Sequence, residues 1–302
     1  MSDRVAAVDC GTNSIRLLIA DVVDGQLSEV DRRMTIVRLG QGVDATGSFA
    51  PEALERVFRA SDEFAAVIRS AGVARMRFVA TSAARDVSNR AEFFTGIRER
   101  YGVEPEIISG AEEAELSFRG ATASLDLPGP YLVADIGGGS TELVLGDAEG
   151  VMAAQSLDIG SVRMTERHVT SDPTTPDELA AITKDVDALL DSSEVPVGEA
   201  RALVGVGGTV TTVAAVALRL PEYDRTAVHH ARIPGADLRT ATTWLTNSSR
   251  AERSAVRSIH AGRVDVIGAG ALILQRLYER MAVDEVIVSE HDILDGVALS
   301  LG

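Results

Sequence analysis

The chain has 302 residues, enough for two domains of ordinary size that each have a hydrophobic core. Apolar residues make up 45% of the sequence, a proportion typical of globular proteins. Acidic residues number 45 and basic residues 29, so the net charge is −16. This charge argues against broad binding to nucleic acid or to an anionic membrane, because both need a basic face. An anionic ligand would have to be met by local arginines, by backbone amides or by a metal ion.

The single cysteine, Cys10, excludes an intrachain disulfide and fits a reducing compartment. The N-terminus has no basic-then-apolar leader, and no stretch approaches the roughly 18 uninterrupted apolar residues of a membrane span. We therefore expect a cytoplasmic protein. Cys10 has no evident basic partner, so we expect a small packed residue rather than a nucleophile. The five histidines lack zinc-ligand spacing, and Trp244 is expected in a core.

Residues 5–21 and 131–147 are two copies of one pattern, related by a constant offset of 126 that aligns Asp9 with Asp135. Each copy consists of an apolar strand, a turn of small residues and a second apolar strand. A further turn follows, marked in the first copy by the hairpin signal Asp24–Gly25. Two copies of one unit imply two related domains.

Helical and strand patterns alternate along the rest of the chain, which indicates an α/β fold. The expected elements are a helix at 51–70, a short strand at 76–81, a helix at 175–192, a strand, glycine turn and helix at 202–220, and a last strand and helix at 286–301. The segment 124–130 is the expected boundary. We expect an N-terminal domain at 1–124 and a C-terminal domain at 125–290, with the last helix, about 291–302, packing back onto the first domain.

Three glycine-rich turns share a design, "DCGTNS", "DIGGGSTE" and "GVGGTVTT", in which hydroxyl residues accompany the glycines after an apolar strand. A plain tight hairpin would explain one such turn, but three predict a phosphate site between two domains. The Gly-Lys-Ser/Thr of a P-loop and the glycine pattern of a Rossmann fold are absent. The residues expected to cradle phosphate are Thr12, Asn13, Ser14, Gly138, Gly139, Ser140, Thr141, Gly207, Gly208 and Thr209.

Duplicated hairpin domains with Asp-led phosphate loops resemble the actin, hexokinase and Hsp70 superfamily. Six segments, "DCGTNSIRLLIAD", "ATSAARDVSN", "ISGAEEAELSFRG", "DIGGGSTE", "GVGGTVTT" and "GRVDVIGAGALIL", resemble in order the motifs of the exopolyphosphatase and guanosine pentaphosphate phosphohydrolase (Ppx/GppA) family, in its short two-domain actinobacterial type. The resemblance implies two duplicated actin-like (ribonuclease H-like) domains with an interdomain cleft. It also implies Mg²⁺-dependent hydrolysis of a terminal phosphoanhydride, with Mn²⁺ as an alternative ion. We further expect a homodimer.

Three acidic residues are the predicted metal ligands. Asp135 and Glu142 bracket the glycine loop from adjacent hairpin strands, so both can face one ion. Mg²⁺ usually takes one or two protein carboxylates and keeps several waters. Glu142 could instead be a solvated strand residue. Asp9 holds the matching place in the first copy, where it either reaches the ion through water or caps the loop amides.

The general base is expected in "ISGAEEAELSFRG". Ser109 and Glu112 form a capping-box pattern, which would turn Glu112 back onto the helix start. Glu113 lies about 100° further round the helix and is free to point towards substrate. The family resemblance places the base on this second glutamate too. The alternative for Glu113 is an acid that merely favours the positive end of the helix dipole.

Arginines are the remaining candidates. Arg85 lies just after a strand end, where α/β folds gather ligand contacts, and by resemblance it binds phosphate; the alternative is a surface arginine. Asn89 is a weaker companion. Arg16 holds the place that Glu142 has in the second copy, so the two hairpins present opposite charges. The run "SEHDILDG" departs from the Gly-Leu-Arg-Glu-Gly run expected from the family.

The favoured function is an exopolyphosphatase that releases orthophosphate from the ends of inorganic polyphosphate and prefers short chains. Hydrolysis of guanosine pentaphosphate is the near alternative, and a sugar or acetate kinase fits the motif order less well. A non-catalytic polyphosphate or nucleotide sensor is the alternative of a different class. Retention of Glu113, Asp135 and Glu142 together argues against a sensor.

Overall fold

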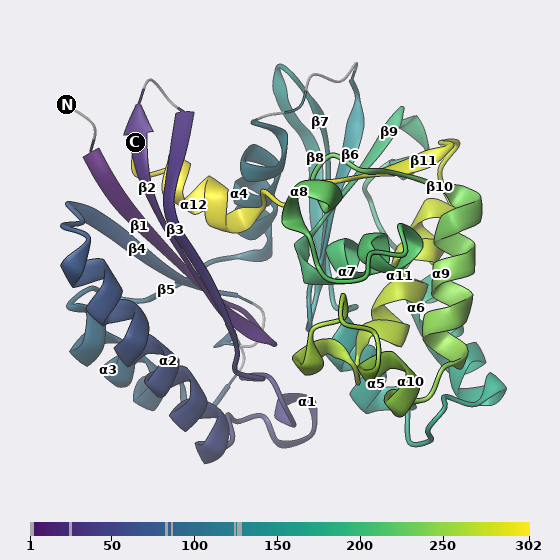
Figure 1. The fold of residues 1–302 in the computed structure, drawn as a ribbon, viewed down its shortest axis with the longest axis horizontal. Helices are drawn as coiled ribbons and strands as arrows, with labels where there is room; N and C mark the ends of the chain where they lie inside the picture. Colours follow the sequence, from purple (N-terminus) through teal and green to yellow (C-terminus); the bar gives the residue numbers. More distant parts are fainter. Residues whose placement is uncertain (1–2, 24–25, 82–83, 86, 124, 126–128) are drawn as a thin grey trace. The chain divides into compact units, whose positions relative to one another are not determined.

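The computed structural model describes residues 3–23, 26–81, 84–85, 87–123, 125 and 129–302. The chain divides into two compact units, which we call unit 1 (residues 1–123 and 291–302) and unit 2 (residues 124–290). Most of the expected boundary segment lies outside the described residues, as does the predicted turn at Asp24–Gly25. Each unit is built around a mixed β-sheet of its own (Figure 1).

Unit 1 contains a five-stranded sheet in the order β3-β2-β1-β4-β5. Its elements are β1 (Asp3–Cys10), β2 (Ser14–Val23), β3 (Gln26–Ile36), α1 (Val43–Thr46), α2 (Pro51–Ser70), β4 (Arg75–Ala80), α3 (Arg90–Tyr101), β5 (Glu106–Ile107), α4 (Gly110–Thr122) and α12 (Ile293–Leu299). The first three strands form an antiparallel meander, whereas β4 and β5 run parallel to β1.

The sheet of unit 1 is buried on both faces, because successive side chains of a strand point to opposite sides. Ala6 and Val8 of β1 belong to a core formed with α2 and α3. Val5 and Ala7 belong to a second core formed with α4 and α12. One helix pair therefore covers each face, as Figure 1 shows for this unit.

Unit 2 contains a six-stranded sheet in the order β10-β11-β9-β6-β7-β8. Its elements are β6 (Tyr131–Ile136), β7 (Thr141–Asp147), β8 (Gly150–Leu157), α5 (Ser161–His168), α6 (Pro176–Asp191), the 3₁₀ helix η2 (Val197–Glu199), β9 (Ala202–Val206), α7 (Gly207–Ala217), α8 (Arg225–Val228), β10 (Arg232–Pro234), α9 (Gly235–Asn247), α10 (Arg250–Ser254), the 3₁₀ helix η3 (Ala261–Arg263), α11 (Ile267–Tyr278) and β11 (Glu285–Val288). One apolar core joins its sheet to α6, α7, α9 and α11.

The two units repeat one topology. The strand order β3-β2-β1-β4-β5 recurs as β8-β7-β6-β9-β11, with the same antiparallel and parallel pairings. Each second strand also carries a register shift, at Ile19/Ala20 in β2 and at Leu145/Gly146 in β7. These positions differ by the same offset of 126 as the sequence repeat. The predicted α/β fold with two duplicated domains is confirmed.

Local sequence signals explain the helix boundaries that were predicted well. α2 begins at Pro51, whose fixed φ suits the first turn of a helix, and it ends at Ser70 as expected. Thr175 and Glu178 form a capping box at the start of α6. Within the described residues, no helix is both long and apolar enough to cross a membrane.

Glycines let α4 and α12 approach closely. A Cβ at Gly120 of α4 would overlap the carbonyl of Asp292, and a Cβ at Gly296 of α12 would overlap the carbonyl of Leu116. Each helix thus contributes two residues four apart, which lie on one face of a helix. The C-terminal helix α12 therefore packs tightly against α4, the helix that carries Glu113.

We expect Gly296→Ala to destabilise unit 1 by about 1 to 3 kcal/mol, because the new Cβ would meet a backbone oxygen that cannot turn aside. Urea unfolding followed by circular dichroism measures this loss. Gly198→Ala is the control, since a Cβ there meets nothing within 4 Å and should change stability by less than about 0.5 kcal/mol. Equal stability of both variants would contradict the close helix contact.

Candidate functional site

The predicted site residues fall into two sets, one in each unit, and each set includes the turn of a hairpin of the repeat. In unit 1 the amide of Gly11 donates to the carbonyl of Ser14 at 2.9 Å. In unit 2 the amide of Gly137 donates to the carbonyl of Ser140 at 3.0 Å. Each bond closes a four-residue turn between antiparallel strands. The repeat therefore extends to the hydrogen bonds.

The glycine loop of unit 2 has its carbonyls occupied by the start of α5. The carbonyl of Gly138 accepts from the amides of Val162 at 2.8 Å and Arg163 at 3.1 Å, and that of Gly139 accepts from Nε of Arg163 at 2.7 Å. A Cβ at Gly160 would overlap this loop. Across the described residues, the amides of Gly138 and Gly139 donate to no protein group. Bare amides in such a loop attract an anion.

The N-terminus of α7 is a second place in unit 2 that favours an anion. Gly207, Gly208 and Thr209 form its first turn directly after β9, and Val206 before them offers no side-chain cap. Uncapped amides at the positive end of a helix dipole bind phosphate readily. Gly207 has φ +79°, and a Cβ there would come within 2.5 Å of Oδ1 of Asp135. The Asp135 carboxylate therefore lies beside this turn.

Arg263 lies against the same turn and is a site candidate that the sequence did not predict. A Cβ at Gly208 would overlap its guanidinium group, whose Nη1 donates to Oγ1 of Thr212 at 3.3 Å. Arg263 belongs to the motif "GRVDVIGAGALIL". No local sequence pattern connects this motif with the turn at Gly207 and Gly208, which lies far earlier in the chain. It adds a cation to a place already suited to an anion.

Asp135 and Glu142 are direct neighbours across β6 and β7, so their side chains leave the same face of the sheet. Glu142 is 1% exposed and accepts a hydrogen bond from Oγ of Ser156 at 2.7 Å, which excludes the solvated alternative. Among the described residues, no three His, Cys, Asp or Glu side chains are grouped to hold a metal ion. A pair of carboxylates fits Mg²⁺, which completes its shell with water and substrate oxygens.

In unit 1, Arg16 lies between two buried aspartates. Its Nε and Nη2 donate to Oδ2 of Asp9 at 3.0 and 2.6 Å, and its Nη1 donates to Oδ2 of Asp292. Burial raises the pKa of the Asp9 carboxyl more than Arg16 lowers it. Burial acts the same way on Asp292, but the charges of Arg16 and Arg32 hold the pKa of that carboxyl below its usual range. Arg16 is thus an anchored cation between two anions.

Glu113 is buried at the start of α4 and forms an ion pair with Nη2 of Arg85, whose Nε also donates to the carbonyl of Ile108 at 3.3 Å. Glu112 behaves differently. Its amide donates to the Ser109 side chain at 3.1 Å as predicted, but its carboxylate accepts from Arg77 at 2.6 Å. The expectation that the Glu112 side chain folds back onto the helix start is wrong, because a neighbouring strand offers it a charged partner.

Several of the hydroxyl and amide residues predicted to cradle phosphate form hydrogen bonds with backbone groups of the fold. Thr141 is fully buried, and its hydroxyl donates to the carbonyl of Ile159 at 2.7 Å, so this hydroxyl is engaged within the fold. In the unit 1 loop, the carbonyl of Thr12 accepts from the amide of Gly40 at 2.9 Å. The remaining members are Asn13, whose carbonyl accepts from the amides of Val37 and Arg38, Ser14, which opens β2, and Ser140, which is buried at the turn of unit 2.

Asn89 and Cys10 have structural surroundings. The Asn89 side-chain oxygen accepts from the amide of Phe49 at 2.9 Å and its nitrogen donates to the carbonyl of Phe49 at 3.0 Å, which ties together the segments before α2 and α3. The side chain of Asn89, suggested as a weaker companion of Arg85, is thus engaged with the backbone through both its oxygen and its nitrogen. Cys10 is buried, and burial raises the pKa of its thiol well above the usual value. The expectation of a packed residue is confirmed for Cys10.

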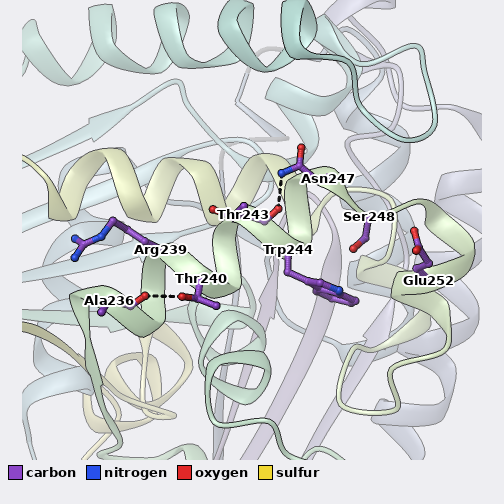
Figure 2. A pocket seen from close by; sticks show the side chains of 8 residues that line it. All are labelled: Ala236, Arg239, Thr240, Thr243, Trp244, Asn247, Ser248 and Glu252. Carbon is purple, nitrogen blue, oxygen red and sulfur yellow. Dashed lines mark hydrogen bonds between the residues drawn. The ribbon is translucent and has the colours of Figure 1, made fainter.

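A surface hollow of about 670 Å³ lies along α9 and α10 in unit 2 and is drawn in Figure 2. It is lined by Ala236, Arg239, Thr240, Thr243, Trp244, Asn247, Ser248 and Glu252. Two of its polar side chains bond to their own helix, Thr240 to the carbonyl of Ala236 and Asn247 to that of Thr243. No predicted site residue lines it. Trp244 is 37% exposed here, so its expected place in a core was wrong.

The repeated topology and the order of the motifs define a two-domain phosphatase family. The model of the Ppx/GppA phosphatase family matches residues 18–301, and the chain belongs to this family. Exopolyphosphatase 2 of Mycobacterium tuberculosis is 50% identical over 314 residues, which cover 99% of this chain and 98% of that protein. A crystal structure of an exopolyphosphatase-like protein is 46% identical, with a TM-score of 0.96 over 100% of this chain and 98% of that one. The Aquifex aeolicus family member is 32% identical, with a TM-score of 0.85 over the same shares.

We expect Gly207→Ala to weaken binding of orthophosphate to the protein. The new Cβ would displace the Asp135 carboxylate, and alanine would strain a backbone at φ +79°. Isothermal titration with orthophosphate and Mg²⁺ should show at least a tenfold loss of affinity, or about 1.4 kcal/mol. Gly198→Ala, in open space, is again the control. Unchanged phosphate affinity in Gly207→Ala would remove this turn from the site.

Proposed function

We propose that the protein is an exopolyphosphatase that hydrolyses the terminal phosphoanhydride bond of inorganic polyphosphate. The observation that carries the proposal is the combination of a buried glutamate paired with an arginine in unit 1 and uncapped amides beside a carboxylate pair in unit 2. Full-length similarity to a protein named Exopolyphosphatase 2 supports the choice of substrate. Hydrolysis needs a held phosphate and a base; unit 2 has donors suited to phosphate, and unit 1 has a carboxylate suited to act as the base.

Binding of the substrate phosphates is assigned to backbone amides and to arginines. The loop of Gly138 and Gly139 and the first turn of α7 offer N–H donors, and Arg263 adds charge beside that turn. Arg85 supplies a guanidinium in unit 1, whose Nη2 pairs with Glu113 and whose Nε donates to the carbonyl of Ile108. Such local donors offset a net charge of −16, which would otherwise repel a polyanion.

Metal binding is assigned to Asp135 and Glu142, with Asp9 as a ligand through water. The ion proposed is Mg²⁺, with Mn²⁺ as the alternative, because both accept hard carboxylate oxygens. When bound, it would neutralise charge on the phosphate oxygens. The protein's part is to hold the two carboxylates on one sheet face, and the cross-strand register does this without a loop rearrangement.

Glu113 is the proposed general base. A water oxygen attacks the terminal phosphorus and its proton passes to the Glu113 carboxylate, while the bridging P–O bond breaks and its electrons leave with the shortened chain. The products are orthophosphate and a polyphosphate one unit shorter. Because Arg85 pairs with Glu113, a phosphate oxygen that draws Arg85 away would leave this carboxylate more basic.

The substrate assay tests the whole proposal. Phosphate release should be measured side by side from short polyphosphate, long polyphosphate and guanosine pentaphosphate, with Mg²⁺ and with excess chelator. We expect the highest kcat/KM on short polyphosphate, because a strongly acidic protein attracts a long polyanion poorly. Chelator should abolish turnover. Faster release from guanosine pentaphosphate would make that nucleotide the substrate, and no release from any of the three would leave a binding protein.

Glu113→Gln should lower kcat by about 10²- to 10⁴-fold, the usual worth of general-base catalysis, and leave KM unchanged or lower. The change is nearly isosteric and removes one negative charge near bound phosphate. Steady-state kinetics on polyphosphate measures both constants. Glu112→Gln is the matched control, because Glu112 is the next residue and pairs with Arg77 instead. If the control lost as much activity as Glu113→Gln, the base would have to be reassigned.

A further inference from the structure

The ion pair of Arg16 and Asp9 has an unusual geometry. Two parallel N–H···O bonds that use both carboxylate oxygens are the favoured form for an arginine and a carboxylate. Here Nε and Nη2 of Arg16 both converge on Oδ2 of Asp9, at 3.0 and 2.6 Å. Oδ1 of Asp9 is buried and has no hydrogen-bond partner among the described residues. A bare buried carboxylate oxygen is costly, so a ligand or a constraint must account for it.

Asp292 supplies the constraint. Its Oδ2 accepts from Nη1 of Arg16, the nitrogen on the far side of the guanidinium from the edge that faces Asp9. The planar group is thereby held by a carboxylate on each side and cannot shift to cover Oδ1. The other oxygen of Asp292 accepts from the amide of Leu294 at 3.0 Å, so both of its oxygens are engaged.

We propose that Asp292 is a positioning residue: it fixes the Arg16 guanidinium on one oxygen of Asp9 and so keeps the other oxygen of Asp9 open to a cation or to the water that the cation carries. The inference rests on the proposed function, which assigns Asp9 to the metal. It gives a role to the run "SEHDILDG", which departs from the expected family pattern. This run contains Asp292 and the first turn of α12.

The position of Asp292 is itself rigid. It is the N-cap of α12 and forms a capping box with Asp295, whose Oδ2 accepts from the Asp292 amide at 3.0 Å. Its carbonyl touches Gly120 of α4. Asp295 forms an ion pair with Arg32 of β3, so the start of α12 is tied to the sheet at two points, by Asp292 to β2 and by Asp295 to β3.

The test variant is Asp292→Asn. Asparagine has one side-chain oxygen, which can cap the Leu294 amide as before, and its NH₂ group then faces Arg16 as a donor instead of an acceptor. The matched control is Asp295→Asn, which makes the same change three residues later. Asp295 is equally buried and also pairs with an arginine, but that arginine is Arg32.

We expect Asp292→Asn to raise the Mg²⁺ concentration for half-maximal phosphate release about tenfold, the lower end of effects for residues that orient metal ligands. The rise in unfolding temperature that Mg²⁺ and orthophosphate give to the folded protein should shrink in the same variant, and this measurement needs no turnover. A crystal structure of Asp292→Asn should show Arg16 on both oxygens of Asp9. Asp295→Asn should lose stability but keep the metal requirement.

Equal metal requirements in wild type and Asp292→Asn, or equal shifts in both variants, would overturn the positioning role. A wild-type protein that releases no phosphate would overturn the proposed function instead. In that case, the metal-dependent unfolding temperatures of the two variants still decide whether Asp292 acts on Asp9.

Discussion

The hydrogen bond that closes each glycine turn is the interaction on which the hairpin of each unit depends. It joins the first and fourth residues of the turn, Gly11 to Ser14 and Gly137 to Ser140. Because this bond fixes the antiparallel register, the residue two places before the turn must face the residue two places after it. These pairs are Asp9 with Arg16 and Asp135 with Glu142. A charged pair and a row of backbone amides are thereby brought together by the backbone alone, whatever the charges are.

The two units use this scaffold with opposite electrostatics. In unit 2 the register pairs Asp135 with Glu142, and two carboxylates on one sheet face repel each other unless a cation lies near them. In unit 1 the register pairs Asp9 with Arg16, which neutralises the charge in place. The residue opposite the aspartate is therefore an anion in the unit 2 hairpin and a cation in the unit 1 hairpin. The amide-to-carbonyl bond that closes the turn is common to both.

Local patterns predicted the fold and the backbone parts of the site, but they did not predict contacts between distant side chains. The repeated hairpins, the start of α2 at Pro51 and the contact of the Glu112 amide with Ser109 follow from periodicity, capping and turn chemistry. Arg263 was missed because its neighbour Gly208 lies far earlier in the chain. The Glu112 side chain was misplaced for a similar reason, since Arg77 comes from a strand that no helix-capping rule considers.

The C-terminal turn shows why such distant contacts matter to the chemistry. α12 touches α4 through glycines at positions where any side chain would collide, so it cannot shift along the helix that carries Glu113. Its first residues hold Arg16 of β2 and Arg32 of β3. One short helix therefore links the proposed base to the hairpin aspartate through contacts that are each stiff: backbone against glycine, and guanidinium between two carboxylates. A substitution at this turn must satisfy both contacts at once. That joint constraint, rather than capping of the helix alone, accounts for a buried aspartate that is paired with Arg16.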